Sequence, residues 1–248
     1  MSRAADLRIM TIAAEKAAVG ITRDFGELER LQVSKKGFKD FVTSSDRRAE
    51  NQIQYFLSKG RPDFSMICEE SGEIINQNSE MSWIIDPIDG TANFMRGIPY
   101  FSINIALQEK ENSVAGLTLD PMRGECFKTE TGGGAFINRQ RLRVSGRESP
   151  KEAVFATHIS AAEDFKLSEL GAIMRRTGSV ALDLAYLSAG KYDAVIAKDV
   201  SIWDIAVGLL MVKESGGFLE YSKSPTGKYE IIAASSMQML SAILSFLK

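Results

Sequence analysis

Two aspartates that flank a short turn have the clearest chemical potential in this sequence. Asp86 and Asp89 lie in the string DPIDGTANF, directly after an apolar run at residues 83–85 that is typical of a buried strand. Gly90 lets the backbone approach a ligand, and Thr91 suits the start of a short helix with unpaired N–H groups. These carboxylates would repel a phosphate unless a cation lay between them, and Mg²⁺ could then hold and polarise it.

Taken alone, such a turn is equally typical of solvated aspartates beside a capping threonine. The complete string, however, resembles the signature of the inositol monophosphatase family of metal-dependent phosphomonoesterases. A second element of that family, a Trp-Asp pair that opens a helix, recurs at Trp203 and Asp204. Both matches stand in the family's order, and they predict a magnesium-dependent hydrolase.

The resemblance implies a set of metal ligands made entirely of oxygen atoms, which suits Mg²⁺ and excludes a zinc-type site. Two or three ions per subunit are expected. One would be held by Glu69, Asp86 and the Ile88 carbonyl, and another by Asp86, Asp89 and Asp204.

The resemblance also implies catalytic and substrate-binding roles. Water is expected to attack the phosphorus without a covalent phosphoenzyme, with Glu69, Thr91 and Asp46 as the catalytic residues. The residues expected at the phosphate or the substrate are Asp89, Gly90, Thr91, Gly178, Ser179 and Asp204. Lys35 corresponds to a loop lysine near the site in the family.

Simpler structural roles compete with three of these assignments. Asp46, in a Thr-Ser-Ser-Asp group, is also the acid expected at the start of a helix over residues 43–59. Glu69 follows a short strand at residues 64–68, where a solvated loop acid is equally typical. Asp204 stands at the start of an apolar helix, where N-capping alone would explain it.

The whole chain has the composition of a globular protein. It contains 248 residues, with 30 basic against 32 acidic side chains and 44% hydrophobic residues. The charge balance makes nucleic acid an unlikely partner. Cys68 and Cys126 have no metal-type spacing, and no segment has the pattern of a signal peptide or a membrane span, so we expect a cytoplasmic protein.

The chain is predicted to form two packed lobes, residues 1–145 and 146–248, with the active site between them. Alternating helices and strands predict an α+β or α/β fold, and the resemblance implies a layered α-β-α-β-α sandwich and a homodimer. The expected helices are 5–28, 43–59, 162–174, 179–189, 202–214 and one from 235; the expected strands are 64–68, 83–85, 101–107, 114–119, 125–129, 135–144, 153–157, 192–197, 218–221 and 230–233.

The substrate is less well defined by the sequence. Many family members carry a glutamate that contacts an inositol hydroxyl, and Ala197 occupies that position here. A small polyol or sugar phosphate resembling inositol 1-phosphate is expected, with histidinol phosphate or a nucleotide phosphate as alternatives. Asp199 could substitute for this glutamate and contact the hydroxyl. A regulatory protein of the same fold, binding transcription machinery or RNA, is the alternative from a different functional class.

Two other features are interpreted as structural. The triple glycine at residues 132–134 lacks the Lys-Ser/Thr of a P-loop and is not followed by a predicted helix, so a tight hairpin is expected. His158 is the only histidine, which excludes a histidine-based nucleophilic system, and it is interpreted as a residue at the end of a strand.

Overall fold

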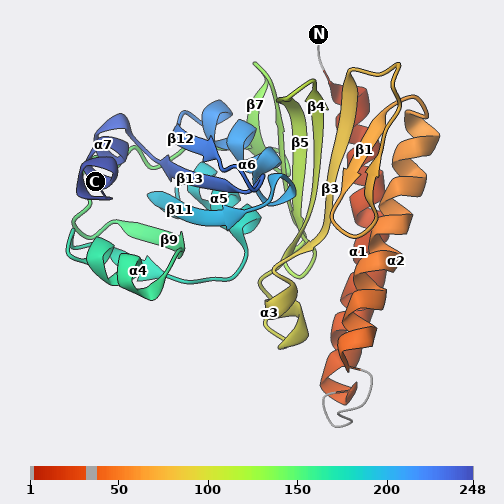
Figure 1. Cartoon of the computed structure of the whole chain (residues 1–248), viewed down its shortest axis with the longest axis horizontal. Helices are drawn as coiled ribbons and strands as arrows, with labels where there is room; N and C mark the ends of the chain where they lie inside the picture. Colours follow the sequence, from red (N-terminus) through yellow and green to blue (C-terminus); the bar gives the residue numbers. More distant parts are fainter. Residues whose placement is uncertain (1–2, 32–37, 248) are drawn as a thin grey trace.

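The fold alternates layers of helix and sheet. The computed structural model describes the backbone of residues 3–31 and 38–247, and the side chains of residues 3–28 and 43–247. Figure 1 shows, from right to left, the helix pair α1 and α2, a large sheet, the helices α5 and α6, a second sheet, and the helices α4 and α7. This is the α-β-α-β-α sandwich expected from the family resemblance.

The first sheet has eight strands in the order β2-β1-β3-β4-β5-β6-β7-β8. Only β1 and β3 pair in parallel, and the strands from β3 onward form the predicted antiparallel meander. The bounds are β1 (Ser65–Cys68), β2 (Gly72–Ile74), β3 (Met81–Asp89), β4 (Ser102–Glu109), β5 (Asn112–Asp120), β6 (Glu125–Glu130), β7 (Gly134–Ile137) and β8 (Gln140–Arg141).

One predicted strand of this sheet is wrong. Residues 135–144 were expected to form a single strand, but β7 and β8 are two short strands that pair antiparallel around a turn at Asn138. Asn138 has a φ of 52°, a left-handed conformation that reverses the chain and that asparagine adopts more readily than most residues. The glycine run at residues 132–134 forms the predicted hairpin turn between β6 and β7.

Helices α1 (Ala4–Leu31) and α2 (Phe38–Gly60) cover the outer face of this sheet (Figure 1). The predicted start of the second helix was wrong, because α2 begins at Phe38. Asp46 therefore lies inside the helix, in its third turn, and its side chain is buried rather than capping a helix end. Lys35 lies outside the described residues.

The second sheet has five strands in the order β10-β9-β11-β13-β12. The strands β10, β9 and β11 pair in parallel and the others antiparallel. The bounds are β9 (Val154–His158), β10 (Ile173–Arg175), β11 (Ala194–Val200), β12 (Phe218–Lys223) and β13 (Tyr229–Ala234), with the helices α4 (Ala161–Ser168) and α7 (Met237–Leu247) on the outer face.

The helix predicted over residues 162–174 was too long. The helix α4 ends at Ser168, and Gly171 follows in a left-handed conformation with a φ of 80°. The chain then turns into β10, which joins the edge of the sheet through the Ile173 amide and the Ala153 carbonyl, 2.7 Å apart. The apolar residues of this segment therefore serve a strand instead of a fourth helical turn.

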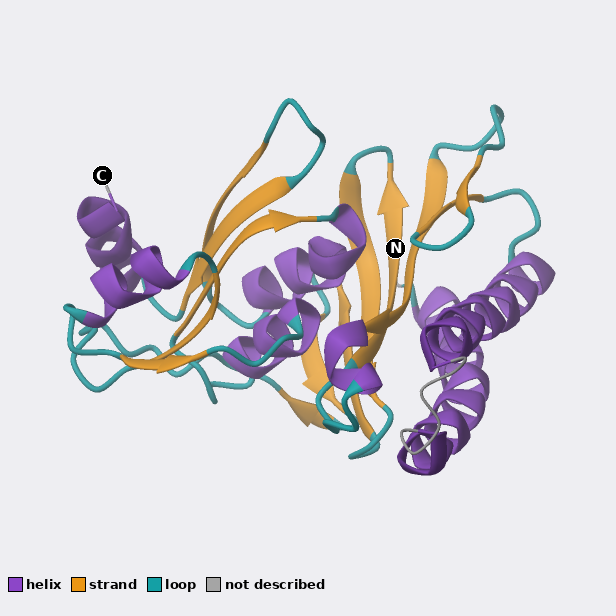
Figure 2. Cartoon of the chain, turned by 60° about the horizontal axis from the view of Figure 1, so that its bottom comes forward, coloured by secondary structure: helices purple, strands orange, loops and turns teal. Residues whose placement is uncertain are grey.

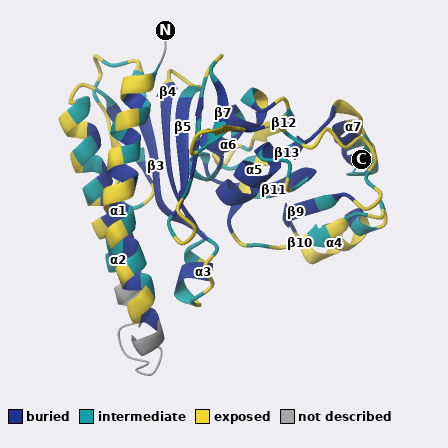
Figure 3. Ribbon diagram, turned by 180° about the vertical axis from the view of Figure 1, so that it is seen from behind, coloured by how far each residue is buried: buried dark blue, intermediate teal, exposed yellow. Residues whose placement is uncertain are grey.

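Helices α5 (Val180–Ser188) and α6 (Ile202–Glu214) fill the space between the two sheets (Figure 2). Both are buried along most of their length, as the dark segments of Figure 3 show. They pack closely because Gly208 of α6 lies against Leu184 of α5, where an added Cβ would be 2.3 Å from the leucine side chain. Gly116 of β5 meets Val207 in the same way, at 2.9 Å. The position of α6 is therefore fixed by tight packing on two sides.

Among the described residues, no helix combines the length and the apolar character needed to cross a bilayer.

Candidate metal centre and active site

The signature turn is built at the end of β3. The strand β3 continues past Asp86 to Asp89, which pairs with Ser102 of β4, so the strand predicted at residues 83–85 was too short. The pairing register shifts between the two aspartates, because Pro87 has no N–H to donate to the ladder. The Ile88 amide donates to Asp86 Oδ1 at 3.0 Å and so stabilises the irregular segment.

Three aspartates from the two halves of the chain converge at this turn. Asp86, Asp89 and Asp204 each offer a carboxylate oxygen, and these oxygens lie within 4.8 Å of one another. Asp204 comes from the first turn of α6, where Ser201 is the N-cap residue and Asp204 completes a capping box with it, so Asp204 does have the predicted capping role. One Asp204 oxygen accepts a hydrogen bond from the Ser201 amide at 2.7 Å, and among the described residues the other oxygen has no hydrogen-bond donor.

Glu69 joins this cluster from the neighbouring strand. It follows β1 directly, and its amide donates to the Ile85 carbonyl of β3 at 3.2 Å. The Glu69 and Asp86 carboxyl groups lie close enough to share a proton. Two carboxylates can approach this closely only when a proton or a cation lies between them.

The acidic groups share a buried environment that penalises their charge. Burial, followed by the neighbouring carboxylates, raises the pKa of Asp86 well above its ordinary value. Burial also raises the pKa of Glu69 to about 7, with Asp204 and Glu70 adding repulsion. The pKa of Asp89 rises to about 7 because of burial and the charge of Asp204. A divalent cation would offset this repulsion, and carboxylate and carbonyl oxygens are the ligands that Mg²⁺ prefers.

Asp46 approaches the centre from α2. Burial raises its pKa to about 8, and the charges of Glu70, Glu69 and Glu50 add to the effect. The family resemblance places a hydrogen bond between Asp46 and Thr91. In the structure the Thr91 hydroxyl instead donates to the Ile88 carbonyl, 3.0 Å away.

The other side of the centre is held by the start of α5. The Ser179 hydroxyl and the Ala181 amide, at 2.9 Å, both donate to Asp89 Oδ2. Gly178 has a φ of 91°, and a Cβ there would lie 2.8 Å from the Asn93 side chain. Both predicted residues, Gly178 and Ser179, therefore lie beside Asp89.

Gly90 lies in the same region. It has a φ of 94°, and a Cβ there would lie 3.1 Å from the Tyr100 carbonyl and 3.3 Å from the Gly178 carbonyl. Glycine is required because both the left-handed conformation and the close backbone approach exclude a side chain. It precedes the short helix α3 (Thr91–Met95), as predicted.

Several polar residues of the site were missed by the sequence reasoning. Glu50 is buried one helical turn after Asp46 and accepts a hydrogen bond from the Glu70 amide at 2.9 Å, so its i+4 spacing was a usable signal. Asn104 donates to Asp86 Oδ2 at 3.3 Å, but an asparagine inside an apolar strand gives no sign of its partner.

The comparisons with known proteins agree with this geometry. The model of the inositol monophosphatase family matches residues 4–245. An inositol-1-monophosphatase of Mesorhizobium japonicum is 44% identical over 229 residues, which cover 88% of this chain and 86% of that protein. The Nus factor SuhB of Pseudomonas aeruginosa is 38% identical over 240 residues, covering 91% and 88% of the two chains.

Solved structures give the same result. The extragenic suppressor protein suhB of Bartonella henselae superposes with a TM-score of 0.87 at 39% identity, covering 98% of each chain. An inositol monophosphatase of Anabaena gives a TM-score of 0.84 at 29% identity, covering 97% of this chain and 94% of that one. With its acidic centre, its sandwich fold and a match along nearly the whole sequence, this chain belongs to the inositol monophosphatase family.

Proposed function

We propose that the protein is a Mg²⁺-dependent phosphomonoesterase that hydrolyses a small polyol or sugar phosphate with an activated water molecule. The convergence of Asp86, Asp89 and Asp204 from distant parts of the chain carries this proposal. Such a group of largely buried carboxylates is unfavourable without a cation.

The proposed ligands of one metal position are Glu69, Asp86 and the Ile88 carbonyl, and those of the other are Asp86, Asp89 and Asp204. Mg²⁺ bound there would supply Lewis-acid polarisation of the phosphate and would lower the pKa of a bound water. Two or three ions per subunit are compatible with this set of oxygen donors.

The protein's own residues would then orient the reaction. Glu69 is proposed to accept a proton from the attacking water. Thr91 and Asp46 are proposed to orient this water. The backbone N–H groups of Gly90 and Thr91 are proposed to hold phosphate oxygens.

On the opposite side, the leaving group would face Asp89 and Asp204, with Gly178 and Ser179 at the edge of the pocket. Ser179 also fixes the orientation of Asp89 through its hydrogen bond, which is the supporting role expected beside a metal ligand.

The substrate class rests on relatives whose names include inositol-1-monophosphatase. Phosphate release should be measured with Mg²⁺ on inositol 1-phosphate, a hexose phosphate, histidinol phosphate and a nucleoside monophosphate. Turnover of inositol 1-phosphate or the hexose phosphate is expected, and activity confined to the last two substrates would reassign the substrate class.

The Asp86→Asn variant tests the metal centre directly. It should lose at least about a thousandfold in kcat while keeping its circular dichroism spectrum, because it removes a shared metal ligand. Asp63→Asn, an exposed aspartate just before β1 and at the far end of that strand from Glu69, is the matched control and should be fully active. An active Asp86→Asn enzyme would refute the assignment.

A regulatory role is a second candidate, favoured by the similarity to proteins named Nus factor SuhB. A pull-down with the protein's own transcription machinery would test it beside the phosphate-release assay.

We further propose that the protein is a cytoplasmic homodimer and that each subunit consists of two lobes, residues 1–145 and 146–248. Size-exclusion chromatography with light scattering would test the dimer.

A further inference from the structure

A buried carboxylate next to the metal centre collects three side-chain donors. Asp183 of α5 is fully buried, and it accepts hydrogen bonds from the Tyr100 hydroxyl at 2.6 Å and the Thr177 hydroxyl at 2.5 Å. Its Oδ2 also lies 2.7 Å from His158 Nε2. The three donors come from the end of β9 and from the segments before β4 and α5. The cluster thus fixes the His158 ring in one orientation.

The second ring nitrogen of His158 remains available. Because Asp183 acts as an acceptor, Nε2 carries the hydrogen and Nδ1 of the neutral ring carries a lone pair. Among the described residues, Nδ1 of His158 has no hydrogen-bond partner. The buried polar atoms without a partner do not include it, so Nδ1 is in contact with solvent. The side chain as a whole is 16% exposed. His158 therefore presents a fixed acceptor at a surface open to a ligand.

This acceptor lies close to the metal centre. His158 and Thr177 both bond to Asp183 Oδ2, and Ser179, two residues after Thr177, donates to Asp89 Oδ2, so the ring lies near the metal centre. In the parallel pairing of β9 with β11, the register partner of His158 is Ala197, a fully buried residue that offers only a methyl group. Of these two paired residues, only His158 supplies a polar side chain.

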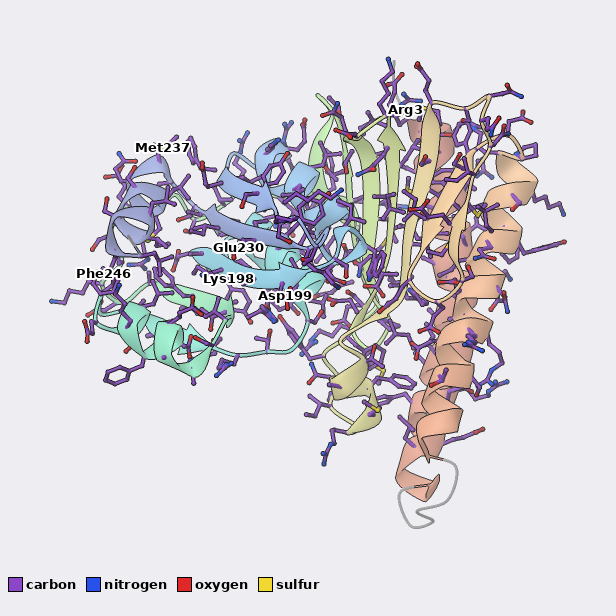
Figure 4. The ribbon with its side chains drawn as sticks, viewed as in Figure 1. Arg3, Lys198, Asp199, Glu230, Met237 and Phe246 are labelled. Carbon is purple, nitrogen blue, oxygen red and sulfur yellow. The ribbon has the colours of Figure 1, made fainter. Side chains whose placement is uncertain are left out.

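Neighbouring charged residues are less suited to this role. Lys198 is bound to Glu163 of α4, with its Nζ 2.7 Å from Oε1. Asp199 is exposed, with a φ of 62° at the irregular end of β11, and Figure 4 labels both residues on that strand. No side-chain partner among the described residues holds Asp199 in place, whereas His158 is oriented by Asp183.

We propose that His158 is a specificity-determining residue whose Nδ1 accepts a hydrogen bond from a hydroxyl group of the leaving polyol. The inference rests on the proposed phosphatase function and narrows it to substrates with a hydroxyl close to the phosphate ester. A leaving group without hydroxyls gains nothing from this contact.

The test compares two substrates of the metal-loaded enzyme, inositol 1-phosphate and phenyl phosphate. His158→Phe keeps a ring of similar size but removes the acceptor. It should raise KM for inositol 1-phosphate about tenfold, as expected for one lost hydrogen bond, with kcat changed less than about twofold. KM for phenyl phosphate should stay within about twofold. His158→Gln, which can donate to Asp183 and accept from a substrate, should recover most of the loss.

Tyr100→Phe is the matched control, because it removes another donor from Asp183 and should affect both substrates equally. Equal losses on both substrates in His158→Phe would show a purely structural role and overturn the inference. So would a selective rise in KM for inositol 1-phosphate in Asp199→Asn with none in His158→Phe. A wild-type enzyme inert on both substrates would instead overturn the proposed function, which is a distinguishable result.

Discussion

The metal-free protein should lose stability as the pH rises, and Glu69 gives the size of the effect. Burial, with repulsion from Asp204 and Glu70, raises the pKa of Glu69 from 4.5 to about 7 in the folded protein. The folded state therefore binds this proton more tightly than the unfolded chain. The resulting stability is fully present below pH 4.5 and is lost as the pH rises through about 7.

Between pH 5 and pH 8 this single group should cost about 2 to 3 kcal/mol of unfolding free energy. In a chain of this length that corresponds to about 5–10 °C in Tm. Mg²⁺ should restore the loss at pH 8, since a ligand that binds only the folded state stabilises it by mass action.

The assay is thermal or urea denaturation of chelator-treated protein at pH 5 and pH 8, with and without Mg²⁺. Glu69→Gln has no titrating group and should show a pH-dependent loss smaller by about 2 to 3 kcal/mol. Glu73→Gln, an exposed glutamate on β2, is the control and should behave as the wild type. An identical pH dependence in wild type and Glu69→Gln, or indifference to Mg²⁺, would refute the buried acidic cluster.

Three further substitutions test contacts that stabilise the site or the fold. Ser179→Ala removes a donor to Asp89 and should raise the Mg²⁺ concentration for half-maximal activity about 10- to 100-fold; an unchanged requirement would contradict this role. Gly178→Ala places a Cβ against Asn93 at a φ of 91°. It should lower the free energy of unfolding, measured in urea, by about 1–3 kcal/mol, and an unchanged value would show that the backbone relaxes without cost. Glu214→Gln weakens the hydrogen bonds that its carboxylate accepts from the glycine turn after β6. It should cost about 1–2 kcal/mol of stability with turnover unchanged, and lost turnover would indicate a closer link to the active site.

The elements that follow simple patterns could be predicted from the sequence. The alternating apolar residues of the meander and the apolar helix opening at Ile202 gave correct elements, because a half-buried strand and a buried helix have distinct spacings. The family signature led to Asp86, Asp89 and Asp204, and the structure brings these three residues together. A lone Asp-Pro-x-Asp turn would not have been sufficient.

The remaining features depend on partners that a sequence does not display. The start of α2 was missed because the Thr-Ser-Ser-Asp group resembles a helix cap, whereas the helix begins at Phe38. His158 was correctly placed at the end of a strand, but its contact with Asp183 joins residues 25 positions apart. Hydrogen bonds of this kind are set by how the sheets and helices pack, so no local pattern predicts them.

The glycines at the centre of the sandwich make metal binding sensitive to substitutions in the packed interior. Asp204 lies in the first turn of α6, and this helix packs closely against α5 at Gly208 and against β5 at Gly116. Replacing either glycine by alanine would place a methyl group in this close contact. The helix would shift by a fraction of an ångström, and Asp204 would move away from the opposing aspartates. Metal affinity can therefore be lost through an apolar substitution at a residue that does not bind the metal.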